Sequence, residues 1–231
     1  MTKFFHRLGA ALSFGVAACA VVAYAVLPLG AALHPDIRPS FALHPAAWVY
    51  LHVFGAAAAL GLGPLQFVGS LRTRRPGLHR WLGRIYLAAG VGIGGSSGFV
   101  LALGAYGGAW SRAGFAALAS LWLACGIVAL QRILCGDVAG HRRWMLRNFA
   151  LACAAVTLRI YLPAAVVAGV AIEVAYPVIA WLCWLPNLVV AEWLLRRRPM
   201  QHCPNCGAGE LKIIAAILER PVIEKILTHL G

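Results

Sequence analysis

Long apolar stretches alternate with short polar segments along this chain. The apolar stretches span residues 8–33, 48–71, 85–105, 115–134, 149–171 and 176–195. Each is long enough to cross about 30 Å of hydrocarbon, which takes roughly 20 helical residues. None contains a run of charges of one sign. The pattern predicts an all-α, polytopic membrane bundle of about six transmembrane helices.

Arginine is concentrated in every second polar segment, and this fixes the predicted orientation. The basic segments contain Lys3 and Arg7; Arg72, Arg74, Arg75, Arg80 and Arg84; Arg142, Arg143 and Arg147; and Arg196, Arg197 and Arg198. The intervening loops contain only Arg38 and Arg112. By the positive-inside rule the basic segments are cytoplasmic, so both the N-terminus and the C-terminus are expected in the cytoplasm.

The first apolar stretch has a second interpretation. Lys3 and Arg7 precede it and Ala23-Tyr24-Ala25 resembles a cleavage site, as in a secretory signal. The stretch is longer than a usual signal core, which favours a retained membrane anchor. Cleavage would leave the other five crossings oriented as described.

Composition supports the membrane assignment and removes several function classes. Hydrophobic residues make up 61% of the chain and charged residues 12%, with a formal net charge of +13. In a soluble protein this positive charge would indicate nucleic-acid binding. Here the basic residues lie in short segments between apolar stretches, so membrane topology explains the charge. The lipid bilayer is therefore the expected partner, and nucleic acid is not. No Ser/His/Asp set in a polar context and no phosphate-binding glycine loop is present, so the sequence does not favour an enzyme.

Small residues recur on two of the predicted crossings. Gly90, Gly94 and Gly98 repeat at every fourth position and so share one helix face, while Gly55 and Ala59 offer a matching surface on the preceding crossing. This spacing allows close approach of two helix backbones. The alternative is a cofactor or lipid lying against the glycine face.

One arginine lies deep in a predicted crossing. Arg159 is about 18 Å from Arg147 along the helix, and His52 reaches a similar depth on the second crossing. A guanidinium keeps its proton, so Arg159 needs an anion, carbonyl groups or water. The two side chains could line a polar cavity, or Arg159 could hold a haem propionate. The structural alternative is an arginine satisfied by backbone carbonyls and by snorkelling.

A second polar group is expected near the cytoplasmic ends. Its candidate members are Gln66, His79, His141, Arg147, Asn187 and Glu192. The chain shows a weak internal repeat of helix pairs, and His79-Arg80 and His141-Arg142 occupy equivalent places in its two halves. In each half the motif follows a glutamine near the end of a helix. Repeats in membrane proteins often place a site at the interface between the two halves. One histidine from each half could supply the two axial ligands of haem b. The alternative is an interfacial segment that binds lipid headgroups.

Several segments together resemble a known family. They are 63–67 (GPLQF), 78–86 (LHRWLGRIY), 140–147 (GHRRWMLR), 157–163 (TLRIYLP) and 184–187 (WLPN) with Glu192-Trp193. In this order they resemble the bacterial multi-pass membrane family catalogued as domain of unknown function 2306, over about residues 8–198. The resemblance implies a location in the bacterial inner membrane. It makes His52, His79, His141, Arg147 and Arg159 the leading site candidates and implies no activity.

The last segment differs in composition, which divides the chain into a membrane domain (1–198) and a short soluble tail (199–231). From about residue 201 to 231 the tail resembles the C-terminal end of rolling-circle insertion-sequence transposases, which implies a reading frame ended inside a mobile element. Cys203 and Cys206 supply only two zinc ligands where four are needed.

Three functions therefore stay open from the sequence. The leading hypothesis is binding of a small lipophilic ligand, haem or quinone in class, within a polar interior site. The second is a small transporter or proton-relay protein that uses Arg159 and Glu192. The third is a membrane assembly or scaffold protein without a site. Oligomeric state does not follow from the sequence.

Overall fold

The computed structural model describes residues 13–20, 23 and 35–196, and within these ranges the chain is helical with no strand. Five helical segments of this part are long and apolar enough to cross a membrane: Ala46–Gln66, Pro76–Leu103, Gly108–Leu134, Val138–Val167 and Ile172–Arg196. The all-α membrane bundle is thereby confirmed. The predicted crossing at 8–33 falls largely outside the described residues, although 13–20 are helical. The cytoplasmic placement of both termini stays a prediction.

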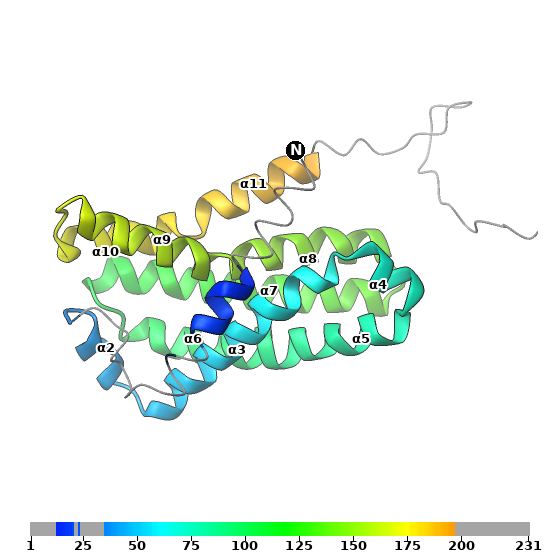
Figure 1. Cartoon of the computed structure of the whole chain (residues 1–231), viewed down its shortest axis with the longest axis horizontal. Helices are drawn as coiled ribbons and strands as arrows, with labels where there is room; N and C mark the ends of the chain where they lie inside the picture. The colour runs from blue at the N-terminus through cyan, green and yellow to red at the C-terminus, as the bar shows by residue number, and fades with distance from the viewer. Residues whose placement is uncertain (1–12, 21–22, 24–34, 197–231) are drawn as a thin grey trace, which may run out of the picture. The chain divides into compact units, whose positions relative to one another are not determined.

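Figure 1 shows how the helices follow one another along the bundle. In chain order they are α2 (Arg38–Ala42), α3 (Ala46–Gln66), α4 (Gly69–Arg74), α5 (Pro76–Ile85), the π-helix η1 (Tyr86–Ile93), α6 (Gly94–Leu103), α7 (Gly108–Leu134), α8 (Val138–Ala152), α9 (Ala154–Val167), α10 (Ile172–Leu182) and α11 (Leu185–Arg196). One end of the bundle carries α4, the start of α5 and the turn from α7 to α8. The opposite end carries α2 and the turn from α9 to α10.

The two basic segments between crossings, residues 72–84 and 142–147, are largely helical, which corrects the expectation that they form loops. Arg72 and Arg74 lie in α4, and Arg80 and Arg84 of the same segment lie in α5. Pro76 begins α5, where its fixed φ suits a first helical turn. Asp137 caps α8 by accepting a hydrogen bond from the Gly140 N–H at 2.7 Å. The helices that contain the third and fifth crossings therefore begin at residues 76 and 138, before the apolar stretches that start at 85 and 149.

The predicted contact between the two small-residue faces is confirmed. A methyl group on Gly55 would lie 2.7 Å from the Gly94 Cα, and one on Gly90 would lie 3.0 Å from the Ala59 Cβ. The backbones of α3 and of the η1–α6 helix thus touch directly. Because α3 covers the glycine face, a cofactor or lipid against that face is excluded.

The described part of the first predicted crossing packs on α3. Ala17 joins a buried cluster with Leu60 and Val156, and Ala20 joins another with Val49. Small side chains again form the contact, as expected where helices associate without a hydrophobic driving force. The helical residues 13–20 therefore lie against α3 and against α9.

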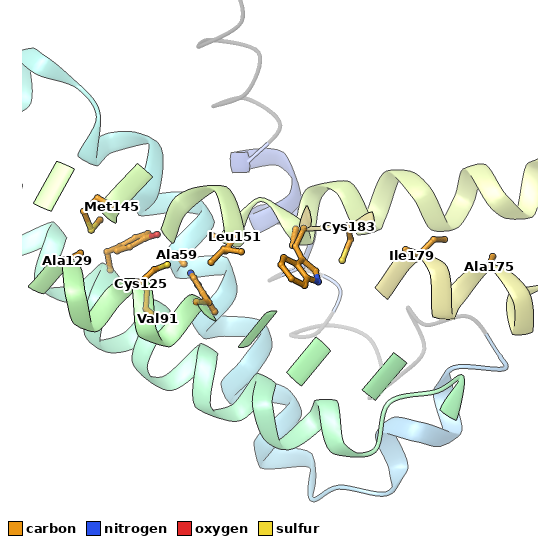
Figure 2. Close-up of a cluster of buried hydrophobic side chains, with 14 residues drawn as sticks. Ala59, Val91, Cys125, Ala129, Met145, Leu151, Ala175, Ile179 and Cys183 are labelled. Carbon is orange, nitrogen blue, oxygen red and sulfur yellow. The ribbon is translucent and has the colours of Figure 1, made fainter. Parts of the chain in front are cut away.

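The main buried cluster runs along the bundle between α7, α8 and α10 (Figure 2). Half of its members are alanine or cysteine, and a chain of hydrogen bonds crosses it. The Tyr86 hydroxyl donates to Asn148 Oδ1 at 2.6 Å, and Asn148 Nδ2 donates to the Trp122 carbonyl at 2.7 Å. Tyr86 and Asn148 are both fully buried. This chain of hydrogen bonds connects η1, α8 and α7 inside the core.

Asn148→Leu is expected to destabilise the bundle more than Tyr86→Phe. The leucine leaves the Tyr86 hydroxyl and the Trp122 carbonyl without their partner, whereas Tyr86→Phe removes one hydroxyl only. We expect losses of about 2 and about 1 kcal/mol respectively. Thermal unfolding in detergent measures both. If Asn148→Leu and Tyr86→Phe unfold at the wild-type temperature, these hydrogen bonds do not contribute to stability.

Candidate functional site

Three of the predicted polar residues gather at the end of the bundle that carries α4. Gln66 ends α3 and is buried, with 8% of its surface exposed. A methyl group on Gly83 of α5 would lie 3.2 Å from Gln66 Oε1. His79 lies four residues before Gly83, and hence on the same face of α5. His79 is also within electrostatic range of His141 on α8. The two His-Arg motifs thus lie at the same end of the bundle as Gln66.

Hydrogen bonding in this group is incomplete. Gln66 Nε2 and His79 Nδ1 are buried and have no hydrogen-bond partner among the described residues. His141 Nδ1 lies 2.8 Å from the Ala129 carbonyl. A carbonyl only accepts, so Nδ1 of His141 carries the proton and a neutral ring leaves Nε2 as an acceptor or metal ligand. Unpaired buried polar atoms are costly, and a bound ligand would satisfy them.

The electrostatic field at this end, called here the basic end, is strongly positive. Residues 67–85 and 131–147 contain five and four arginines, nine in all, while the acids in these ranges and in 188–195 are Asp137 and Glu192. The opposite end is balanced, because residues 35–47, 104–113 and 164–175 contain two acids and two arginines. There, burial and then the carboxylates of Glu173 and Asp36 raise the pKa of Tyr106. An anionic or acceptor-rich ligand would therefore favour the basic end.

Arg147 and Glu192 form a two-bond ion pair between α8 and α11. Arg147 Nε lies 2.5 Å from Glu192 Oε1, and Arg147 Nη2 lies 3.1 Å from Oε2. The guanidinium also lies 4.7 Å from the centroid of the Trp144 ring. Both residues were candidates from the sequence, but their pairing was not predicted. The pair holds α11 against α8, and Arg147 is thereby engaged within the fold.

Asn187, another candidate, is engaged in a helix contact. Its Nδ2 donates to Thr157 Oγ1 at 3.1 Å and to the Cys183 carbonyl at 3.0 Å. The Thr157 hydroxyl also donates to the Cys183 carbonyl. These bonds join α9 to α11 and to the turn before it, and the Asn187 amide nitrogen is satisfied within the bundle. Thr157 was missed by sequence reasoning, because a lone threonine in an apolar helix resembles a packing residue.

His52 and Arg159 lie at similar depth, as helix rise predicts. His52 is six residues inside the start of its span, and Arg159 is eight residues before the end of its own. The charge of Arg159 acts on the His52 ring. His52 Nδ1 lies 2.9 Å from the Gly94 carbonyl, and Arg159 Nη1 donates to the Ala155 carbonyl at 3.0 Å. Backbone carbonyls thus contribute to satisfying both groups.

Other predicted chemistry falls outside these groups. No cluster of three or more His, Cys, Asp or Glu side chains suited to a metal ion occurs in residues 13–20, 23 and 35–196. Cys203 and Cys206 lie outside the described residues, as does the transposase-like tail. Tyr86, Trp122 and Asn148 were not singled out from the sequence, because uncharged polar residues give no topology signal.

Comparison with known proteins identifies one family. No curated protein and no solved structure matches the chain. The family model described as "Predicted membrane protein (DUF2306)" matches residues 49–195, which include α3 from its fourth residue and α4 through most of α11. The match therefore includes Gln66, His79 and His141 together with the Arg147–Glu192 pair. The chain belongs to the predicted membrane protein family DUF2306.

Proposed function

We propose that this protein binds a small lipid-soluble ligand of the quinone class at the basic end, in the bacterial inner membrane. The observation that carries the proposal is the pair of buried, unpartnered atoms, Gln66 Nε2 and His79 Nδ1. A quinone carbonyl accepts hydrogen bonds from an amide N–H and from an imidazole N–H. The nearby guanidinium groups of Arg72 and Arg142 would favour the electron-rich forms of such a ring.

Apolar surroundings support a lipid-soluble ligand over a water-soluble anion. Phe67 follows Gln66 directly, and its ring lies 5.5 Å from the Phe149 ring. Phe67 is also 40% exposed on the surface of the bundle. A ring-shaped ligand would therefore meet aromatic surface beside the polar donors, the usual composition of a small-molecule site.

The test compares Gln66→Leu with Gln131→Leu, a matched change at an exposed glutamine near the end of α7. Binding of a short-chain ubiquinone by the detergent-purified chain is measured by tryptophan quenching and equilibrium dialysis. We expect Gln66→Leu and His79→Phe each to weaken binding about tenfold, as for loss of one hydrogen bond to a buried group. Gln131→Leu should bind as wild type.

Stability separates a ligand site from a merely structural glutamine. Because leucine removes an unpaired buried amide, Gln66→Leu should keep or raise the unfolding temperature of the ligand-free protein. Lower stability together with unchanged quinone binding would overturn the proposal. So would absence of saturable quinone binding to the wild-type chain.

Haem b is the second candidate, favoured by the ring orientation of His141. Its Nδ1–H is held by the Ala129 carbonyl, the arrangement common for metal-ligating histidines. His79 would supply a second nitrogen ligand, and Arg72 and Arg142 the positive charge for propionates. Protein purified from haem-supplemented cells should then show a Soret band that His141→Ala abolishes.

A proton relay through Arg159 and Glu192 finds less support, because Arg159 keeps its proton and Glu192 pairs with Arg147.

A further inference from the structure

Two helices at the basic end are longer than a bilayer core requires. The span Pro76–Leu103 has 28 residues and Val138–Val167 has 30, whereas about 20 cross the hydrocarbon. The opposite ends of both helices finish on apolar residues, Leu103 and Val167, which are 56% and 88% exposed. The excess of about eight to ten residues therefore projects at the basic end. The first turns of α5 and α8 lie at the level of the lipid headgroups.

The projecting part of α5 has the composition of an interfacial helix. Leu78 and Trp81, three residues apart, are 40% and 58% exposed, and tryptophan prefers the boundary between hydrocarbon and headgroups. Arg80 and Arg84 are also exposed and lie four residues apart on one face. Thus the projecting part of α5 presents Trp81, a residue suited to the boundary between headgroups and hydrocarbon, beside the exposed guanidinium groups of Arg80 and Arg84.

The projecting part of α8 adds two more arginines close by. Arg142 and Arg143 are exposed in the second turn of α8. Arg142 lies within electrostatic range of His79 on α5, so the positive charges of the two projecting turns act at the same end of the bundle (Figure 1). The two carboxylates at this end form ion pairs with Arg132 and Arg147. Two carboxylates against nine arginines leave a large positive excess, whatever the individual pairings.

We propose that the projecting turns of α5 and α8 form a binding surface for anionic phospholipid. Arg80 and Arg84 contact headgroup phosphates from one side, and Arg142 and Arg143 from the other. Guanidinium groups bind phosphate oxygens through paired hydrogen bonds, which lysine does not reproduce. Trp81 lies at the boundary between the headgroup and the acyl chains of the same lipid. This surface is separate from Gln66 and does not depend on quinone binding.

Native mass spectrometry of the detergent-purified chain tests the proposal. Tetraoleoyl cardiolipin, dioleoylphosphatidylglycerol and dioleoylphosphatidylcholine are added at equal concentration, and a parallel arm adds inorganic phosphate. We expect the anionic lipids to be retained about tenfold more than phosphatidylcholine, and retention to fall with rising salt. Equal retention of phosphatidylcholine, or full displacement by inorganic phosphate, would overturn the proposal.

Paired substitutions locate the surface while leaving seven arginines at this end to maintain membrane insertion. Arg80→Gln/Arg84→Gln and Arg142→Gln/Arg143→Gln should each lower retention of anionic lipid about tenfold. The matched control Arg38→Gln/Arg112→Gln, at the balanced end, should retain lipid as wild type. Arg80→Lys/Arg84→Lys keeps the charge and gives an intermediate value. It serves as the second variant should the glutamine pair express poorly. Wild-type retention in both basic-end variants, or an equal loss in the control, contradicts this assignment.

Discussion

Gly55→Ala is expected to lower the stability of the bundle, whereas Gly61→Ala on the same helix is expected to be neutral or stabilising. A methyl group at Gly55 would lie 2.7 and 2.8 Å from the Gly94 Cα and N atoms, all of them backbone. At Gly61 it would meet no atom within 4 Å. Both changes give the same gain in helix propensity, up to about 1 kcal/mol. The difference between them therefore reports packing alone.

Overpacking a rigid helix contact costs about 1–3 kcal/mol, and here the backbones of α3 and α6 must separate as a unit. We expect Gly55→Ala to lower the unfolding temperature and the yield of monodisperse protein in detergent. Gly94→Ala should do likewise, since its methyl group would lie 3.0 Å from the Ala56 N atom. Equal unfolding temperatures for Gly55→Ala and Gly61→Ala would show that α3 and α6 are not in contact.

This contact was predictable because it depends on spacing within single helices. Residues four apart share a face, so Gly90 and Gly94 could be assigned to one surface without coordinates. The similar depths of His52 and Arg159 follow in the same way from helix rise. Hydropathy likewise identified the five spans of the described residues, because an apolar run of about 20 residues is the pattern of a membrane-spanning helix.

The starts of the helices were less predictable, for a physical reason. Arginine interrupts a hydropathy pattern, so the segments before residues 85 and 149 were expected to be loops. A helix continues into the headgroup layer, however, where charged side chains are solvated and backbone hydrogen bonds are still favourable. Pro76 and Asp137 are the signals that mark the true starts, at the first turn of α5 and the cap of α8.

Pairings between distant helices could not be read from the sequence. Arg147 and Glu192 are 45 positions apart, and Tyr86 and Asn148 are 62 apart. Which residues meet depends on the rotation of each helix about its axis, and that rotation results from packing of the whole bundle. For the same reason, the missing partners of Gln66 and His79 become evident only when all neighbouring helices are in place.

Breaking the Arg147–Glu192 pair is the second change with a large expected effect. The side chains are 18% and 36% exposed, and each single removal takes this ion pair away from a charge that is largely shielded from solvent. We expect Arg147→Met and Glu192→Leu each to cost about 2–4 kcal/mol, somewhat less than for a fully buried pair. The double variant should cost clearly less than the sum, because two apolar side chains leave no isolated charge.

The coupling energy from this double-mutant cycle, measured by unfolding in detergent, should be about 1–3 kcal/mol. Arg132 supplies the control, since it pairs with Asp137 at 3.3 Å while its side chain is 54% exposed. Arg132→Met should therefore cost no more than about 1 kcal/mol. Additive effects of Arg147→Met and Glu192→Leu would mean that the two groups act independently. In that case the contact of α11 with α8 would not depend on this ion pair, and apolar packing alone would stabilise it.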